Sequence, residues 1–333
     1  MIRMVSGYVR SFWMPLAVLW VTLGISGILY ARYLGAPPMV ATVVILAFLL
    51  ESSFYFATGV DQLRKKIEAC LRPPVLSLVL TLSGLVPYCT YSLPTGNFRW
   101  SAVGVLIVVS GSLCLWYAVL PRTMLVDISF LCFSGGIALS KVLSVVYTHP
   151  YPGLHVETLG QLMWIRLGIS AVLSMRKLEN VGFGFLPRKT DWLIGLRHYV
   201  YFLPVGLPIA LSIGLVRFHP MEVAWWKAVL ITTVTFFAML WVVALAEEFF
   251  FRGLLQQWLT RWSGSSAAGL AIASLIFGLA HLNFRFFPNW RFALLAGIAG
   301  TFYGSAYKRA GSIRAAMVAH ALVNTTTRML FSG

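Results

Sequence analysis

The chain has 333 residues, of which 59% are hydrophobic and only 11% are charged. Soluble domains carry about 25% charged residues, so this composition cannot cover a water-facing surface and excludes an ordinary soluble protein. The net charge is +16, but the sequence contains no basic run long enough to bind nucleic acid. The excess of Lys and Arg instead indicates membrane topology, and we predict an all-α polytopic membrane protein in contact with a lipid bilayer.

Apolar runs of roughly 20 residues, the length that crosses a bilayer, recur along the whole chain. The first run is too long for a secretory signal and no small-residue cleavage site follows it, so we expect an uncleaved first span. The sixth run is short and contains Arg166, which would suit an interfacial position. The runs predict about eleven transmembrane helices, near residues 12–31, 38–59, 74–92, 101–120, 124–146, 160–175, 198–216, 228–250, 266–283, 291–307 and 315–331.

Positive charge concentrates in the loops around residues 64–72, 176–197 and 308–314. These loops lie on one side of the membrane if the N-terminus is cytoplasmic, and the positive-inside rule therefore predicts that orientation. We expect a multi-pass integral membrane protein with a cytoplasmic N-terminus, residing in a bacterial inner membrane.

Residues 176–197 combine charged residues with Gly and Pro, which is typical of a cytoplasmic linker or amphipathic segment. This segment divides the chain into an N-terminal membrane module, residues 1–175, and a C-terminal module, residues 198–333. The N-terminal module has roughly five or six spans, and its sequence assigns it no chemistry.

Several polar residues of the N-terminal module are expected to have ordinary roles. Lys141, Arg166 and Asp127 could pair with one another, but snorkelling or a helix-end position is the expected outcome. The histidines that flank spans are expected to be loop residues: His149, His155, His198 and His219. The cysteines have no paired spacing and are expected to be small apolar residues: Cys70, Cys89, Cys114 and Cys132.

The C-terminal half carries polar residues inside its apolar runs. Each ionisable group placed within a membrane costs about 2.5 to 3.5 kcal/mol on insertion scales, so such groups are functional hypotheses by default. Three clusters qualify: "EEFFFR" at 247–252, "FGLAH" at 277–281 and "HALVN" at 320–324.

The first cluster predicts different roles for two adjacent glutamates. Glu248 and Arg252 are four residues apart, which puts them on one helix face as an ion pair. Glu247 points about 100° away around the helix and has no cation nearby in the sequence. A carboxylate without a cation in an apolar setting is suited to act as a general base near neutral pH. The alternative is that this motif merely ends a helix at the membrane surface.

The other two clusters are expected to lie at the depth of Glu247. A turn at "SGSS", residues 263–266, predicts a helical hairpin, and Glu247 and His281 are equally far from Gly264 on either side. Antiparallel helices rising from that turn would bring the two side chains together, with a first helix, about 228–262, longer than the bilayer is thick. His320 and Asn324 share a face of the last span, and both can donate hydrogen bonds.

The three motifs resemble those of a known family. "EEFFFR" resembles the EExxxR motif of the CPBP family, which comprises CAAX proteases and bacteriocin-processing enzymes and is also called the ABI family. "FGLAH", with Phe277 and His281, resembles its FxxxH motif, and "HALVN" resembles its HxxxN motif. The motifs occur in the family's order, and the resemblance covers roughly residues 180–331.

This resemblance implies an intramembrane glutamic endopeptidase whose C-terminal helical bundle encloses a polar site. It implies that Glu247 activates a water together with His281, that His320 and Asn324 hold the oxyanion, and that no acyl-enzyme forms. Glu248, held by Arg252, would support the site or help to place the substrate. The implied substrate is a peptide or a membrane-anchored protein, and no cofactor is expected. A prenylated CAAX tail is the eukaryotic family substrate, but nothing in the sequence indicates prenyl recognition.

Two other functions stay open from the sequence. In a zinc-dependent metalloprotease, Glu247, His281 and His320 would be ligands with water as the fourth, although the sequence has no HExxH motif. Polar residues between membrane helices also occur in transporters, and some members of the family are regarded as immunity or scaffold factors, so a non-catalytic role is the third reading.

Overall fold

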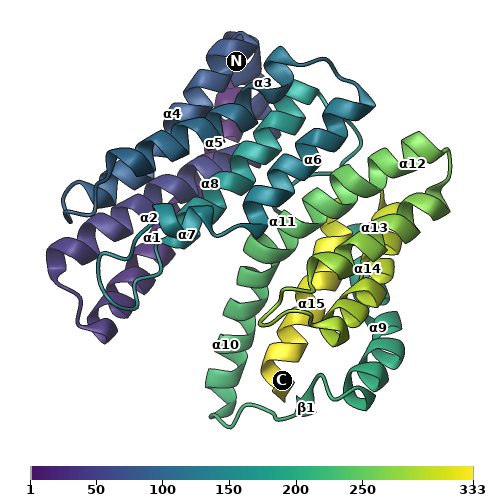
Figure 1. The fold of residues 1–333 in the computed structure, drawn as a ribbon. Helices are drawn as coiled ribbons and strands as arrows, with labels where there is room; N and C mark the ends of the chain where they lie inside the picture. Colours follow the sequence, from purple (N-terminus) through teal and green to yellow (C-terminus); the bar gives the residue numbers. More distant parts are fainter. Residues whose placement is uncertain (1, 333) are drawn as a thin grey trace. The chain divides into compact units, whose positions relative to one another are not determined.

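The computed structural model describes residues 2–332, with side chains described from Phe12 onward. Apart from two short strands, the regular structure of these residues is helical (Figure 1). The chain divides into two compact units, Met1–Leu178 (unit 1) and Glu179–Gly333 (unit 2). The boundary falls inside the predicted linker.

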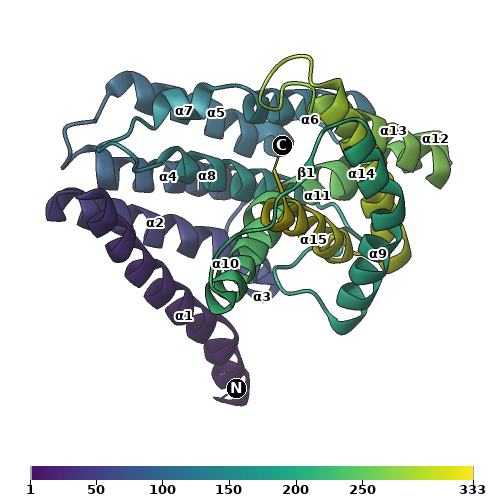
Figure 2. The ribbon, with the colours of Figure 1, turned by 90° about the horizontal axis from the view of Figure 1, so that it is seen from below.

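Unit 1 is a bundle in which α2, α4, α5 and α8 run side by side (Figure 2). A proline begins both α2 and α4, where its fixed φ suits the first helical turn and its missing N–H costs nothing. The elements of unit 1 are α1 (Ile2–Leu34), α2 (Pro38–Thr58), α3 (Asp61–Cys70), α4 (Pro73–Ser92), α5 (Trp100–Val119), α6 (Met124–Leu139), α7 (Val142–Val146), α8 (Glu157–Ser170) and the π-helical segment η1 (Ala171–Arg176).

A buried ion pair joins α2 to α8 inside unit 1. Arg166 Nε lies 2.6 Å from Glu51 Oε1, and the two side chains are 2% and 0% exposed. Ser83 of α4 completes the cluster, since Arg166 donates to its hydroxyl at 2.8 Å and to its carbonyl at 3.0 Å. The expectation that Arg166 snorkels or lies at the interface is therefore wrong, because a fully buried carboxylate and a serine satisfy its guanidinium.

A second ion pair of unit 1 involves Asp127, which lies in the first turn of α6. Arg176 reaches both carboxylate oxygens of Asp127, at 2.8 and 2.9 Å, and Tyr117 donates to Oδ1 at 2.9 Å. Asp127 therefore lies at a helix end, as expected, and is in addition buried and paired with Arg176. Lys141, in contrast, is exposed just before α7.

Unit 2 contains one unusually long helix. Residues Trp225–Ser263 are continuously helical, which at 1.5 Å per residue is about 58 Å. This long helix comprises α10 (Trp225–Ala238), η2 (Met239–Ala244), α11 (Leu245–Glu248), η3 (Phe249–Gln256) and α12 (Gln257–Ser263), of which η2 and η3 are π-helical. The other elements of unit 2 are α9 (Lys189–Ser212), β1 (Arg217–Phe218), α13 (Ser266–Ala280), α14 (Trp290–Ala310), α15 (Ile313–Leu330) and β2 (Phe331–Ser332).

The last helix, α15, is central in unit 2 and contacts α9, α10, α11 and α14 (Figure 1). Small residues allow this close packing, as is typical of helices in membranes. A Cβ on Gly195 of α9 would lie 2.6 Å from Val318 Cβ, and one on Gly278 of α13 would lie 2.6 Å from the Ala293 carbonyl oxygen of α14. The two strands pair antiparallel, Arg217 with Ser332, and attach the end of α15 to the segment before the long helix.

The first residues of unit 2 pack against the α14–α15 turn. Tyr307 donates to the Asn180 carbonyl at 3.4 Å, and Ser312 donates to the Gly182 carbonyl at 3.0 Å. A Cβ at Gly182 would lie 2.3 Å from Ser312 Cα, and its φ is +62°, so glycine is required there. The second half of the predicted linker is helical, because α9 begins at Lys189.

Within the described part of the chain, seven helical segments are long and apolar enough to cross a membrane: Phe12–Leu34, Pro38–Thr58, Pro73–Ser92, Trp100–Val119, Glu157–Arg176, Lys189–Ser212 and Trp225–Ser263. Met124–Leu139 and Ser266–Ala280 are apolar but shorter, and α14 and α15 carry more polar and small residues because they pack within unit 2. A multi-pass membrane protein is thus supported. The prediction of eleven spans and that of a cytoplasmic N-terminus stay predictions.

The Arg166–Glu51 pair generates a stability prediction. Arg166→Met leaves an uncompensated carboxylate in the bundle and should lower the free energy of unfolding by about 3–5 kcal/mol. Equilibrium unfolding of the detergent-purified protein measures this loss. The double variant Glu51→Gln/Arg166→Met removes both charges and should recover most of it. A single variant as stable as the parent would contradict a structural role for the pair.

Candidate active site

The two glutamates of the first motif lie in α11, between two π-helical segments. Such segments, with i→i+5 hydrogen bonds, are rare and often occur at functional sites. Glu248 is fully buried, whereas the Glu247 side chain is 29% exposed. The adjacent carboxylates therefore have different surroundings, as the helical offset between them predicts.

Glu248 contacts two side chains from different helices, Arg252 of the long helix and His320 of α15. Its Oε2 lies 3.1 Å from Arg252 Nε in an ion pair, which is the i,i+4 pair that the sequence predicts. Its Oε1 lies 2.7 Å from His320 Nδ1 of α15. The link to His320 was not predicted, because nothing in the spacing of the motifs relates these two residues.

Arg252 is held on three sides in the interior of unit 2. Besides facing Glu248, it donates through Nη2 to the Gly300 carbonyl of α14 at 3.1 Å. Its guanidinium carbon lies 4.5 Å from the centre of the Phe277 ring, within cation–π range. The charge of Glu248 is therefore balanced by a side chain that three helical segments hold in place.

Glu247 faces both histidines. Its Oε2 lies 3.8 Å from His281 Nε2 and 3.9 Å from His320 Nε2. These distances exceed a direct hydrogen bond but suit a bridge through one water. Among the residues that the structure describes, Oε2 is buried with no hydrogen-bond partner, and no Lys or Arg forms an ion pair with Glu247. Buried polar atoms nearly always have a partner, so this oxygen is placed to bind water or a ligand.

The predicted hairpin explains how His281 reaches this position. The long helix ends at Gly264, whose φ of +68° reverses the chain, and the Ser265 hydroxyl accepts from Ala268 N to cap α13. His281 follows the last residue of α13, where the chain has returned to the level of Glu247. The equal sequence distances from Gly264 thus correspond to spatial neighbours.

The hydrogen bonds of the histidines define which ring nitrogen carries a proton. His281 Nδ1 lies 2.7 Å from the Phe277 carbonyl oxygen, which can only accept. His320 Nδ1 likewise faces the carboxylate oxygen of Glu248. Both Nδ1 atoms therefore donate, and in each neutral ring the bare Nε2 faces Glu247.

Aromatic rings fix the orientation of His320. Tyr303 of α14 stacks on it with ring centroids 4.6 Å apart and planes 12° from parallel, and Phe277 lies edge-on at 6.0 Å. Tyr303 was not predicted as part of the cluster. A signal was present nonetheless, since small residues recur before and after it, at Gly300 and Gly304, and allow α14 to approach the site closely.

Asn324 lies one turn beyond His320 on α15. Its Nδ2 is 4.0 Å from Met239 Sδ of η2, and sulfur is only a weak acceptor. No hydrogen bond between Asn324 and Glu247 or His281 occurs among the described residues. Five of the six predicted residues thus form one connected cluster, and Asn324 flanks it with an amide whose partner is the weak acceptor Met239 Sδ.

A carboxylate and two imidazoles thus converge inside an apolar helical bundle. Residues 224–326 match the family model described as Type II CAAX prenyl endopeptidase Rce1-like. The family resemblance is therefore confirmed over this segment, which contains all six predicted site residues. The match covers less than half of the chain and none of unit 1. Neither the curated proteins nor the solved structures gave a match.

The two glutamates should differ in their effect on stability. Glu248→Gln removes the anion between Arg252 and His320 and should lower the free energy of unfolding by about 3–5 kcal/mol. Glu247→Gln is the matched control, because Glu247 has no ion pair with Lys or Arg among the described residues, and it should cost less than about 1 kcal/mol. Equilibrium unfolding in detergent compares them, and equal losses would contradict the assigned pairing.

Proposed function

We propose that the protein is an intramembrane endopeptidase that hydrolyses a peptide or membrane-anchored protein with a glutamate-activated water. One observation carries the proposal: the buried Glu247 oxygen lies 3.8 and 3.9 Å from the Nε2 atoms of His281 and His320. The family match over the same segment supports it. Unit 1 contributes none of the proposed catalytic residues.

In the proposed mechanism, Glu247 and His281 hold the attacking water. The water donates one hydrogen to Glu247 Oε2 and the other to the bare Nε2 of His281, so that its lone pairs face the substrate carbonyl. Glu247 takes the proton as the water oxygen attacks the carbonyl carbon, and then delivers that proton to the leaving amine. The C–N bond breaks, a carboxyl group and an amine form, and no acyl-enzyme is needed.

The oxyanion that develops on the substrate would be stabilised by His320 and Asn324. His320 already donates through Nδ1, so it serves as an oxyanion donor only when a second proton is on Nε2. The Glu248 carboxylate lies 2.7 Å from Nδ1 of that ring, and Arg252 pairs with the same carboxylate. Asn324 supplies a neutral N–H donor. Donors held in place in a site of low dielectric are the largest contribution to many hydrolytic reactions.

A zinc-dependent hydrolase is the second candidate, favoured by one observation. Ligating histidines usually donate their other N–H to a carboxylate or a backbone carbonyl, as His320 and His281 do here. The donor positions fit less well. Among the described residues, Glu247, His281 and His320 do not form a cluster whose ligand atoms all lie within 4.8 Å of one another. The glutamate mechanism is therefore preferred.

Peptide cleavage by purified variants tests the proposed roles. Glu247→Gln should abolish cleavage while the protein stays inserted and folded, because the amide cannot take the proton from water. Asn324→Ala should lower kcat on the order of 10² to 10³-fold, as loss of one oxyanion donor does. The matched control, Glu222→Gln, changes an exposed glutamate and should cleave normally. Cleavage by Glu247→Gln at the parental rate would end the proposal.

Exhaustive chelation separates the two candidate mechanisms. Under the glutamate mechanism, cleavage of a peptide by the detergent-solubilised protein should continue at an unchanged rate after chelation and gel filtration. Loss of activity, with recovery on adding one equivalent of zinc in the parent but no zinc binding in His281→Ala, would instead establish the zinc mechanism.

A further inference from the structure

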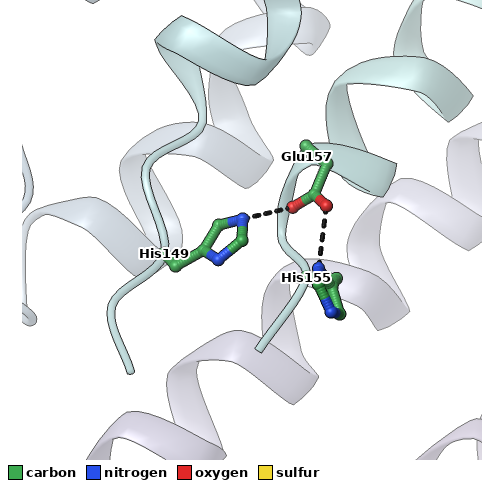
Figure 3. A group of neighbouring side chains, drawn as sticks. All are labelled: His149, His155 and Glu157. Carbon is green, nitrogen blue, oxygen red and sulfur yellow. Dashed lines mark hydrogen bonds and ion pairs between the residues drawn. The ribbon is translucent and has the colours of Figure 1, made fainter. Parts of the chain in front are cut away.

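Unit 1 contains a cluster of metal-ligating side chains that the proposed peptidase does not use. His149 and His155 come from the loop between α7 and α8, and Glu157 is the first residue of α8. From the sequence, both histidines are expected to be ordinary loop residues. The fold instead turns both rings toward the same carboxylate (Figure 3).

The three side chains meet at short distances. His149 Nε2 lies 2.7 Å from Glu157 Oε2, and His155 Nδ1 lies 2.9 Å from Glu157 Oε1. The two imidazole rings are 5.2 Å apart and nearly perpendicular, at 79°. One ligand atom from each residue lies within 4.8 Å of the other two, and this is the only such group among the residues that the structure describes.

Buried neighbours hold the loop in this shape. Tyr147 precedes His149 and is fully buried, and Leu154 and Val156 on either side of His155 are buried as well. Tyr30 of α1 donates to the Gly153 carbonyl at 3.0 Å. The donor atoms are thus positioned before any ligand arrives, which reduces the entropic cost of binding.

The cluster is also open to solvent. The side chains of His149 and His155 are 41% and 63% exposed, while that of Glu157 is 22% exposed. An ion can therefore reach all three donors from outside unit 1, and the exposed rings can adjust their positions without disturbing the packed residues beside them.

The donor set is that of a zinc site. Two imidazole nitrogens and one carboxylate oxygen are three of the four ligands in a common tetrahedral arrangement, in which water takes the fourth position. With bonds of about 2.0–2.2 Å, neighbouring donors in a tetrahedral site are about 3.3 Å apart. The two nitrogen–oxygen distances, 2.7 and 2.9 Å, are shorter than this spacing, so both rings would move outward to bind an ion.

We propose that His149 Nε2, His155 Nδ1 and the Glu157 carboxylate bind a divalent transition-metal ion, zinc foremost, with one position open to water. One carboxylate balances the charge of only one protonated imidazole, whereas a single metal ion engages the lone pairs of both neutral rings and the anion. The bound ion links the α7–α8 loop to the start of α8 and stabilises unit 1 by mass action.

Zinc titration of the tag-free, full-length protein in detergent tests the site. After chelation and gel filtration, zinc chloride is added against a chromophoric competitor. The parent should bind zinc at His149, His155 and Glu157 and gain thermal stability. His149→Ala/His155→Ala should weaken binding at least about 100-fold, because even loss of an outer-sphere partner costs roughly 10–100-fold. Both changes lie on an exposed loop, and the variant should unfold like the metal-free parent.

Two matched variants make the result specific. His219→Ala removes a loop histidine of unit 2 and should bind zinc like the parent. His281→Ala removes a residue of the proposed active site and should also keep the zinc. Parental protein that binds no zinc at micromolar concentration would overturn the inference, as would a double variant that binds it with unchanged affinity. Zinc that is lost only with His281→Ala would overturn it too, and would assign the ion to the other cluster.

Discussion

The geometry of unit 2 depends on one buried carboxylate, Glu248, which faces Arg252 along its own helix and His320 from α15. A buried charge is tolerated only when it is paired. Removing any one of these three side chains would therefore leave a buried polar or charged group without its partner and lower the stability of the protein. Arg252 extends the set to α14 through the Gly300 carbonyl. Because Glu248 is hydrogen-bonded to Nδ1 of His320, the other ring nitrogen, Nε2, faces Glu247.

Intramembrane ionisable groups in this protein fall into two kinds, and their partners distinguish them. Glu51 and Arg166 are buried, and Arg166 donates to both carboxylate oxygens of Glu51 and to the Ser83 hydroxyl. The charges of this pair are therefore satisfied by each other and by Ser83. Glu247 is partly exposed, faces two imidazole rings beyond hydrogen-bond distance and keeps one buried oxygen without a partner among the described residues. Only the second arrangement leaves polar capacity for a water and a substrate, which is why the proposed chemistry is assigned there.

Local spacing predicted much of this site, because helices convert sequence distance into geometry. The i,i+4 rule predicted the Glu248–Arg252 pair, and the position of Gly264 predicted that Glu247 meets His281. Contacts between distant segments could not be predicted in this way. No sequence spacing relates Glu248 to His320 or Glu51 to Arg166, which meet only through the packing of separate helices. The His149–His155 cluster depends on a loop whose path is set by buried neighbours, and no local sequence pattern predicts that path.

The central claim is that Glu247, His281, His320 and Asn324 surround one water-accessible site within the bundle. A density map of the protein with a phosphinic peptide, whose tetrahedral phosphorus imitates the hydrolytic intermediate, tests it most directly. The account predicts one phosphinyl oxygen beside Glu247 and His281 and the other within hydrogen-bond distance of His320 and Asn324. A phosphinyl group bound away from these side chains, or through a metal held by Glu247 and the two histidines, would contradict it.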